Sequence, residues 1–312
     1  MDCICSNDNG IVKGVVMSMK LHILSAGPLT TVQDLGRFGY MDCGMTTSGV
    51  MDRSAYAQAN ELVGNVHGEA VLEFTLAGPK IRIEGEGLIA IAGAEMTASL
   101  NGRTLDRGRV YAVRDGQVLE FGMAVQGLRG YLACAGGIDV PKIMGSRSTN
   151  LKCGLGGYQG RKLASGDVLD CGSVHLPPWR FRKLCRRSIP MPSYEDHIQV
   201  EVILGPQEDH FTKQGIRDFL GEEYTVSPQS DRMGLRLAGA AIEGTGPMDI
   251  ISDGITFGSV QVTSQGLPIV LMADHQTTGG YAKIATVVSG DLPALAQARP
   301  GTKIRFYTGQ RV

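Results

Sequence analysis

Short apolar runs bounded by glycine recur along this chain, and they constrain its fold more than any other feature. The chain of 312 residues contains 43 Gly, about twice ordinary usage. Apolar runs that end at Gly, Pro or Asp are typical of strands in an antiparallel barrel or sandwich. We expect strands at 21–24, 71–76, 80–83, 88–92, 110–113 and 117–121. The sequence therefore predicts a mainly β protein.

The length of the chain exceeds what one hydrophobic core usually serves, so we expect two modules. A weak internal repeat supports them, because residues 21–121 and 200–307 each open on a strand and Gly-Pro and close on an alternating strand ending in Phe. Chance similarity is the alternative. The expected parts are a disordered N-terminal extension at 1–18, a first β module with a Gly-rich insertion at 19–175, a linker at 176–198 and a second β module at 199–312.

Helical periodicity is found in few places. The clearest runs from Asp52, a plausible N-cap, to Leu62, and Gly64 supplies its end. Two more short helices are expected at 207–215 and 217–220. In the linker, Pro177-Pro178 argues against both a helix and a central strand. The Arg-rich part of the linker is either a solvated connector or a docking segment for a partner.

Charge and cysteine usage exclude several classes of protein. Lys and Arg total 30 against 31 Asp and Glu, which argues against non-specific nucleic-acid binding. No run of 18 apolar residues occurs, so no membrane-spanning helix is predicted. The 7 Cys include no Cys-x-x-Cys pair and the 6 His lack metal-ligand spacing. Reduced thiols, a cytoplasmic location and no metal site are expected.

The densest group of polar side chains is the stretch 273–281, which lies between two apolar runs, 267–273 and 284–288. It contains Asp274, His275, Gln276, Thr277 and Tyr281, and Gln265 lies just upstream. Loops held by rigid strands concentrate binding chemistry, so we expect a site here. The alternative is a hairpin turn whose polar side chains satisfy their own backbone.

Two further clusters combine carboxylates with guanidinium groups. One runs from 30 to 37 and on to 48–52, with Gln33, Asp34, Arg37 and Asp52, and the other contains Asp231 and Arg232. Arginine can bind a substrate carboxylate through two parallel hydrogen bonds. A structural ion pair is the alternative at each place.

A fourth cluster is Gly-rich and spans residues 154–162. Successive backbone N–H groups around Gly156 and Gly157, with the charge of Arg161, suit an anion-binding loop. The segment matches neither a P-loop nor a dinucleotide fingerprint. A plain turn is the alternative.

Several phrases along the chain together resemble one family, the biotin-dependent carboxyltransferase domains and their allophanate hydrolase subunit 2 homologues. The resemblance implies cyclophilin-like β-barrel modules with a few short helices. The phrases are Thr-Thr-Val-Gln-Asp-Leu-Gly-Arg (30–37), Ser-Gly-Val-Met-Asp (48–52), Ala-Asn-Glu-Leu-Val-Gly-Asn (59–65), Leu-Glu-Phe-Thr-Leu-Ala-Gly-Pro (72–79), Gly-Gly-Ile-Asp-Val-Pro (136–141), Gly-Ser-Arg-Ser-Thr (145–149), Ser-Asp-Arg-Met-Gly-Leu-Arg (230–236) and Ala-Asp-His-Gln-Thr-Thr-Gly-Gly-Tyr (273–281).

Within this family the chain most resembles the branch formed by the C subunits of 5-oxoprolinase. The resemblance implies an amide hydrolase that uses ATP with subunit-A-like and subunit-B-like proteins to open 5-oxoproline to glutamate. One alternative is the carboxyltransferase subunit of a biotin-dependent urea or amide carboxylase, and another is a non-catalytic regulatory partner of a kinase-inhibitor-like protein. The chain has no Met-Lys-Met biotin attachment phrase and no visible nucleotide motif, so biotin, if used, is carried by another chain and the ATP site cannot be located.

The resemblance also implies roles for residues. Asp274 and His275 are expected to transfer protons, and Asp274 is favoured because many relatives carry Arg where this chain has His275. Gln265, Gln276 and Tyr281 are expected to orient the amide, and Arg37 or Arg232 to hold a carboxylate. The expected substrate-binding set is Gln33, Asp34, Arg37, Asp52, Asp231, Arg232, Gln265, Gln276, Thr277 and Tyr281.

Overall fold

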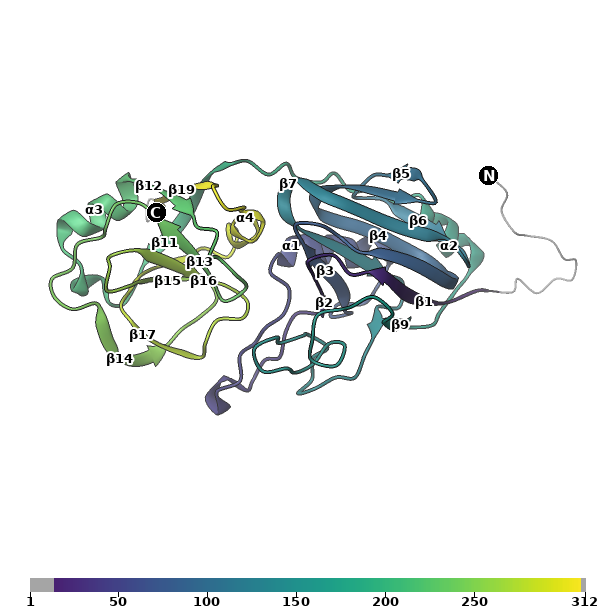
Figure 1. Ribbon diagram of the computed structural model, residues 1–312, viewed down its shortest axis with the longest axis horizontal. Coiled ribbons are helices and arrows are strands. Elements are labelled where there is room, and N and C mark those ends of the chain that lie inside the picture. The colour runs from purple at the N-terminus through teal and green to yellow at the C-terminus, as the bar shows by residue number, and fades with distance from the viewer. Residues whose placement is uncertain (1–13, 310–312) are drawn as a thin grey trace, which may run out of the picture.

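The computed structural model describes residues 14–309 as two β modules that lie end to end (Figure 1). The mainly β fold with two barrel-like modules is confirmed. No helix within residues 14–309 has the length and apolar character needed to cross a membrane.

The first module contains β1 (Val15–Ser25), β2 (Leu29–Gln33), η1 (Met41–Cys43), α1 (Arg53–Val63), β3 (Val71–Thr75), β4 (Lys80–Leu100), β5 (Arg103–Leu105), β6 (Val110–Val113), β7 (Val118–Cys134), β8 (Ile138–Asp139), β9 (Val168–Cys171), β10 (Val174–Leu176) and α2 (Pro178–Cys185).

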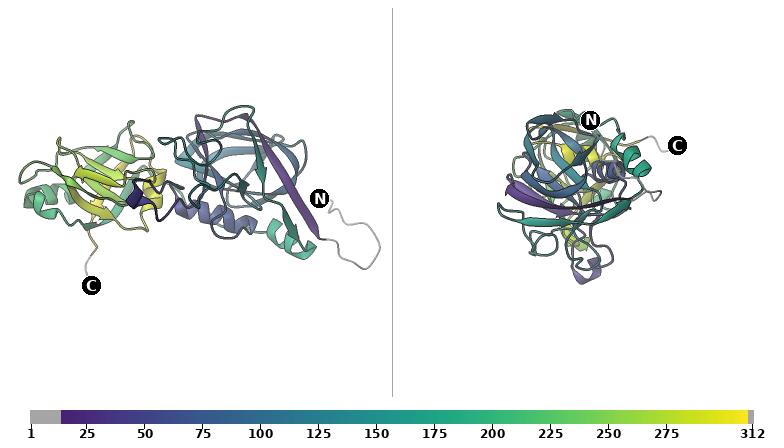
Figure 2. Two further views of the ribbon diagram at one scale, coloured as in Figure 1. Left: turned by 90° about the horizontal axis from the view of Figure 1, so that it is seen from below. Right: turned by 90° about the vertical axis from the view of Figure 1, so that its right-hand side faces the viewer.

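The second module is a closed barrel of seven strands in the order β11-β18-β15-β16-β13-β12-β19, with a separate ribbon of β14 and β17. The left view of Figure 2 shows this module, green to yellow, end to end with the first. Phe219, Tyr224 and Phe306 pack together in its core, the first and last stacked at 4.7 Å. Its elements are β11 (His197–Leu204), η2 (Glu208–His210), α3 (Lys213–Gly221), β12 (Glu223–Val226), β13 (Gly234–Ala238), β14 (Asp249–Gly254), β15 (Ser259–Val262), β16 (Pro268–Leu271), β17 (Thr278–Tyr281), β18 (Lys283–Val287), α4 (Leu292–Gln297) and β19 (Lys303–Tyr307).

The first module is built around two long antiparallel strands, β4 and β7, at the centre of the order β2-β3-β7-β4-β1-β9-β8. The runs 80–83 and 88–92, expected as separate strands, are parts of β4. The strand continues through Gly85, which has φ +87°. Only glycine fits at this position, because a Cβ there would lie 2.3 Å from the Ser18 carbonyl oxygen. A glycine-induced irregularity in one strand therefore resembles a turn in the sequence.

Helix α1 forms where the sequence predicts it. Asp52 Oδ1 accepts from the Ala55 N–H at 2.9 Å, which caps the first turn. Gly64 ends the helix in the left-handed conformation, at φ 75°. The face that includes Tyr56 and Leu62 is buried against β4 and β7. The helix thereby brings its N-terminus to the junction with the second module.

The expected helices at 207–215 and 217–220 are replaced by the short turn η2 and one helix, α3. Thr212 decides the start of α3, because its Oγ1 accepts from the Gly215 N–H at 2.9 Å. Gln207 lies just before η2, and its side chain bonds to the Lys283 N–H at 3.1 Å and to Asp253 at 3.1 Å.

The expected boundaries of the modules need three corrections. Strand β1 begins at Val15, so 15–18 belong to the first module, whereas residues 1–13 of the expected extension lie outside the described range. The linker contains helix α2, because proline is tolerated in the first turn and Pro178 occupies it. Strand β11 begins at His197, so the connection between α2 and the second module is 186–196.

Met51 and Gln297 are two of the residues through which the modules contact each other. Met51 of the first module is buried in the core of the second. Gln297 of α4 reaches back: its Oε1 accepts from the N–H groups of Leu128 (3.0 Å) and Arg129 (2.9 Å), and its Nε2 donates to Asp52 Oδ2 at 2.8 Å. The junction is thus specified by hydrogen bonds that only the correct docking satisfies.

Replacing Gln297 with Leu is expected to lower the free energy of unfolding by about 1–3 kcal/mol, because buried N–H groups and the Asp52 carboxylate lose their partner. Urea unfolding of the full chain measures the change. Gln229→Leu is the matched control, since Gln229 is exposed. Equal stability of the two variants would contradict a structural role for Gln297.

Candidate functional site

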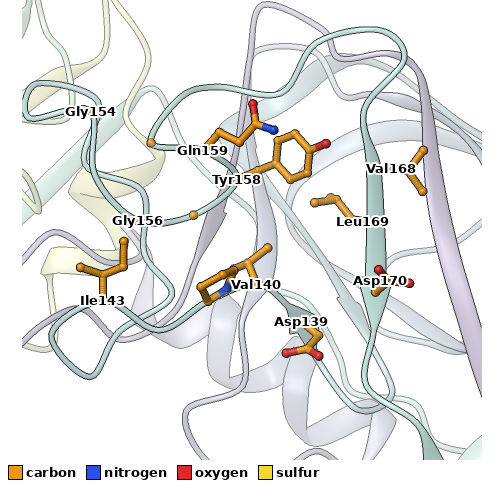
Figure 3. A pocket seen from close by; sticks show the side chains of 13 residues that line it. Asp139, Val140, Ile143, Gly154, Gly156, Tyr158, Gln159, Val168, Leu169 and Asp170 are labelled. Carbon is orange, nitrogen blue, oxygen red and sulfur yellow. The ribbon is translucent and has the colours of Figure 1, made fainter.

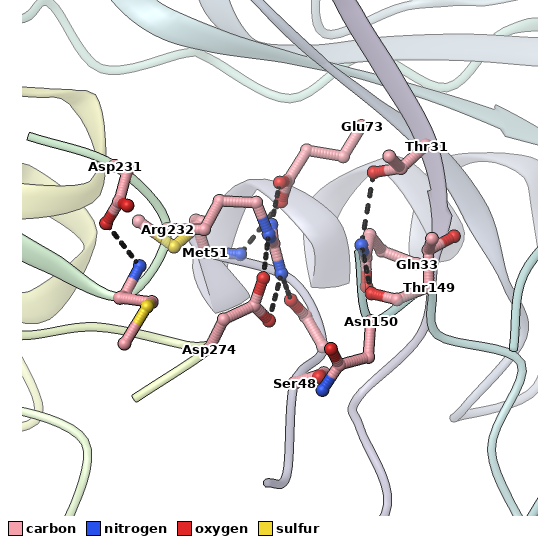
Figure 4. Close-up of polar contacts among 12 residues, drawn as sticks. Thr31, Gln33, Ser48, Met51, Glu73, Thr149, Asn150, Asp231, Arg232 and Asp274 are labelled. Carbon is pink, nitrogen blue, oxygen red and sulfur yellow. Dashed lines mark hydrogen bonds and ion pairs between the residues drawn. The ribbon is translucent and has the colours of Figure 1, made fainter. Parts of the chain in front are cut away.

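A buried ion-pair cluster at the module junction is centred on Arg232, which precedes β13 (Figure 4). Its Nε donates to Asp274 Oδ2 at 2.8 Å and its Nη2 to Asp274 Oδ1 at 3.1 Å. Its Nη1 bonds to Glu73 of β3, and its Nη2 also donates to the Gly49 carbonyl at 2.5 Å. Arg232 thus joins the loop after β16 to the first module.

Glu73 is held from both sides. Its Oε2 accepts from the Met51 N–H at 2.8 Å and from the Tyr131 hydroxyl at 2.9 Å. Its side chain is 2% exposed, and that of Arg232 is 6%. Burial alone would lower the pKa of Arg232, but the charges of Asp274 and Glu73 raise it well above its ordinary value. The guanidinium is therefore permanently charged and keeps Asp274 oriented.

Asp274 and His275 follow β16 and differ in their chemistry. The Asp274 N–H donates to the Arg232 carbonyl at 2.8 Å, which fixes the backbone of the loop. His275 Nδ1 lies 2.5 Å from the Gln276 carbonyl oxygen, and since a carbonyl only accepts, Nδ1 carries the proton. The other ring nitrogen, Nε2, is then an acceptor. A carboxylate held by Arg232 and an imidazole whose Nε2 can accept a proton thus follow each other in the chain, and both are groups that can transfer protons.

Burial lowers the pKa of His275, and this effect outweighs the opposing hydrogen bond to Gln276 and the charge of Asp274. We expect an NMR titration to place the His275 ring midpoint below 6.5, with His275→Gln identifying the resonance. Since the unfolded ring titrates near 6.5, neutral His275 supports folding above that pH. This support is lost as pH falls through the lower folded pKa. A midpoint at or above 6.5 would contradict the assignment.

Asp34 anchors the loop that follows β2. Its Oδ1 accepts from the hydroxyls of Ser146 (2.6 Å) and Ser148 (2.5 Å), and its Oδ2 from the Arg147 N–H at 2.6 Å. The Arg37 guanidinium instead donates from Nη2 to the Ser148 carbonyl at 2.5 Å. Asp34 therefore bonds to 146–148, and Arg37 bonds to the Ser148 carbonyl and not to the Asp34 carboxylate. Gln33 Nε2 donates to the Thr149 carbonyl at 3.1 Å.

A pocket of about 280 Å³ lies between the outer face of the second barrel and the segment 276–281. Asp231, Gln276 and Tyr281 line it together with Arg236. Asp231 also holds its own turn, because its Oδ1 accepts from the Met233 N–H at 2.8 Å. The structure thus gathers three of the expected substrate-binding residues in one pocket, which Asp274 does not line.

Other expected residues lie apart from this cluster. Gln265 is at the β15–β16 turn, at the opposite end of β16 from Asp274, and lines a different pocket of about 410 Å³. Thr277 accepts through its carbonyl from the Ile255 N–H at 3.2 Å. Asp52 caps α1, and burial raises its pKa against the hydrogen bonds from Ala55 and Gln297.

The Gly-rich segment forms part of the wall of a pocket of about 370 Å³ in the first module (Figure 3). Gly156 and Gly157 line it, but its charged side chains are the carboxylates of Asp139 and Asp170. Arg161 is bound to Asp167 through two hydrogen bonds of 2.7 and 2.8 Å. The cation that we expected to attract an anion is therefore already neutralised.

Three residues of the junction were not expected from the sequence: Glu73, Tyr131 and Gln297. Glu73 had a signal, since it is the one carboxylate within the apolar run 71–76. A charged residue in a strand that is buried on both faces has to be paired. Tyr131 and Gln297 lie among apolar residues and carried no comparable signal. Within residues 14–309, no three His, Cys, Asp or Glu side chains are placed to hold a metal ion.

Comparisons with known proteins agree on one family. The sequence profile of the carboxyltransferase domain, subdomain A and B, matches residues 43–308. The C subunit of 5-oxoprolinase from Escherichia coli (strain K12) is 38% identical over 289 residues, which cover 92% of this chain and 90% of that protein. The same subunit of Haemophilus influenzae is 35% identical over 286 residues, with the same coverage of 92% and 90%. The crystal structure of Kluyveromyces lactis urea carboxylase is similar with a TM-score of 0.84 and 29% identity, over 97% of this chain but only 28% of that one.

Proposed function

The chain belongs to the family of the carboxyltransferase domain, subdomain A and B, and from this premise we propose that it is a subunit of an ATP-dependent 5-oxoprolinase complex that opens 5-oxoproline to glutamate. The proposal rests on the likeness to the C subunit of 5-oxoprolinase over nearly the whole of both chains. Subunit-A-like and subunit-B-like proteins would be its partners. The chain has no nucleotide motif, so we assign ATP to the complex.

The cluster of Arg232, Glu73 and Asp274 at the junction gives the proposal chemical support. Opening a lactam adds water across its C–N bond, so a base has to take a proton and an acid has to return one to nitrogen. Asp274 is held in one orientation by two bonds from Arg232. His275, neutral and with Nε2 able to accept, stands beside it. These groups serve any small amide, and a positioned pair of this kind accelerates reactions typically about 10²–10⁴-fold.

The experiment is reconstitution of the full chain with its two partner proteins. Glutamate is measured from 5-oxoproline plus ATP, with and without avidin. Glutamate formation that avidin does not affect supports the proposal. Avidin-sensitive consumption of ATP and bicarbonate with urea would instead indicate a biotin-dependent carboxyltransferase subunit. A tight complex without turnover of any amide would indicate a regulatory partner.

A further inference from the structure

The Arg-rich segment that follows β10 forms a charged surface that the candidate site does not use. Helix α2 lies at the end of the first module that faces away from the second module (Figures 1 and 2). Trp179, the one tryptophan of the chain, is 60% exposed there. We call the exposed aromatic and cationic side chains of the helix and its C-cap the α2 patch: Trp179, Arg180, Arg182, Lys183 and Arg186.

The opposite face of α2 and the residues after it fix the patch to the first module. Leu184 is 4% exposed and packs in the apolar core beside α1. Arg187 donates from Nη1 to the Glu61 carbonyl of α1. The Ile189 N–H donates to the Gly108 carbonyl at 2.8 Å. The backbone that carries the patch is thus anchored, so binding through it would order few further residues.

The four cations of the α2 patch lack counter-charges. Within the part of the chain that the structure describes, none of them forms an ion pair. The sequence around them offers no carboxylate either, because residues 171–194 contain no Asp or Glu. For comparison, two exposed lysines of the same module are paired, Lys20 with Asp170 at 3.4 Å and Lys80 with Glu120 at 3.1 Å.

The stability of α2 does not explain this accumulation of charge. Cations near the C-terminal end of a helix interact favourably with its dipole, and Arg182 and Lys183 lie in the last turn. Arg180, however, lies in the first turn, where a cation is unfavourable. Arg182 and Arg186 are four positions apart, a spacing at which like charges oppose helix formation. The cations therefore weaken the helix in part, which favours a role in binding.

The composition of the α2 patch favours a protein partner that presents carboxylates. Tryptophan and arginine are enriched among the side chains that dominate the energy of protein interfaces. Arginine also binds a carboxylate through two parallel hydrogen bonds. A second copy of the chain, paired through the patch by a two-fold axis, would bring like charges together. The net charge of the whole chain is −1, so no general attraction to nucleic acid or to an anionic membrane is expected.

We propose that the α2 patch docks an acidic surface of a protein partner in the proposed complex. Trp179 packs at the centre of this contact, and the four cations pair with carboxylates of the partner around it. The inference rests on the proposed function, because that function supplies the partners. The patch lies apart from the Arg232 cluster, so docking through it assembles the complex and adds no group to the chemistry.

The test measures binding of the full chain to the subunit-A-like and the subunit-B-like protein separately, by calorimetry at about 50 and about 300 mM salt. We expect one partner to bind, at least about tenfold more weakly at the higher salt. Arg182→Glu/Lys183→Glu should weaken that partner at least about 100-fold at low salt, and Trp179→Ala at least about tenfold at both salts. Lys213→Glu/Arg217→Glu, at exposed positions of α3, is the matched control and should keep the affinity.

Several results would overturn the docking surface: unchanged affinity of Arg182→Glu/Lys183→Glu for both partners, equal weakening by the α2 and α3 variants, or no binding of either partner to the unmodified chain. Thermal unfolding checks that the variants fold. If charge reversal impairs folding, Arg182→Gln/Lys183→Gln has to lose at least about fivefold in affinity. A short DNA duplex and phosphatidylserine vesicles represent other occupants. If the patch bound either of them while partner binding stayed intact, the protein partner would be the wrong assignment.

Glutamate release separates this proposal from the proposed function. At partner concentrations well above the weakened dissociation constant, Arg182→Glu/Lys183→Glu should regain the kcat of the unmodified complex. A complex that forms through the α2 patch but releases no glutamate would contradict the 5-oxoprolinase activity and retain the docking surface. Glutamate release by a complex whose affinity does not respond to the α2 substitutions would do the reverse.

Discussion

The Arg232→Met variant is expected to lose about 3–5 kcal/mol of unfolding free energy, the largest effect on stability among the substitutions considered. The substitution leaves the carboxylate of Glu73, 2% exposed, without its cation inside the protein. It also frees Asp274 and removes the bond to Gly49 that joins the modules. Urea unfolding of the full chain, followed by circular dichroism, measures the loss.

The double variant Glu73→Gln/Arg232→Met tests the cause. If the loss comes from an unpaired buried charge, removing that charge should restore part of the stability. A double variant that is less stable than Arg232→Met would indicate that shape, and not charge, decides the effect. If Arg232→Met lost less than about 1 kcal/mol of unfolding free energy, the Arg232–Glu73 pair would contribute no more than an exposed surface ion pair does. That result would contradict the role that we infer from its burial.

Asp274→Asn is expected to lower turnover of the reconstituted complex at least about tenfold, toward the range of about 10²–10⁴ that a positioned acid or base contributes. Asparagine has the same shape, and Arg232 keeps its bond to Glu73, so the fold should persist. Initial rates of glutamate release from 5-oxoproline measure the effect.

Asp209→Asn is the control for that experiment, because Asp209 is exposed in η2, away from the junction. Thermal unfolding of both variants distinguishes lost chemistry from lost structure. Full activity of Asp274→Asn would remove Asp274 from proton transfer and leave His275 as the base to be examined.

Local signals in the sequence predicted much of the fold. Asp52 and Gly64 bounded α1 correctly because each acts on backbone groups within a few residues of its own end of the helix. The helices at 207–220 were misplaced since Gln207 bonds to Lys283, far along the chain. Strand β4 was divided at Gly85 because the close approach of Ser18 is a tertiary fact. Such contacts leave no periodicity in the sequence.

The site was predicted as separate clusters, and the structure shows how they meet. Arg232 and Asp274 were both candidates, but nothing in the sequence pairs them with each other or with Glu73. The partner of Arg37 was also beyond the sequence, where pairing with Asp34 was the natural alternative. Serine hydroxyls from 146 and 148 occupy Asp34 instead. Which partner a polar residue selects depends on the docking of segments more than a hundred positions apart.

The pairing of Glu73 with Arg232, which are 159 positions apart, has a consequence for how such chains can diverge. A sequence that changed Arg232 first would pass through a form in which the buried Glu73 carboxylate has lost its cation. Lineages should therefore either keep both residues or have replaced both within a short interval. Recombination that joined a first half from one lineage to a second half from another would fail wherever these two positions disagreed. We therefore expect the two halves to be inherited as one unit, although the linker between them is short.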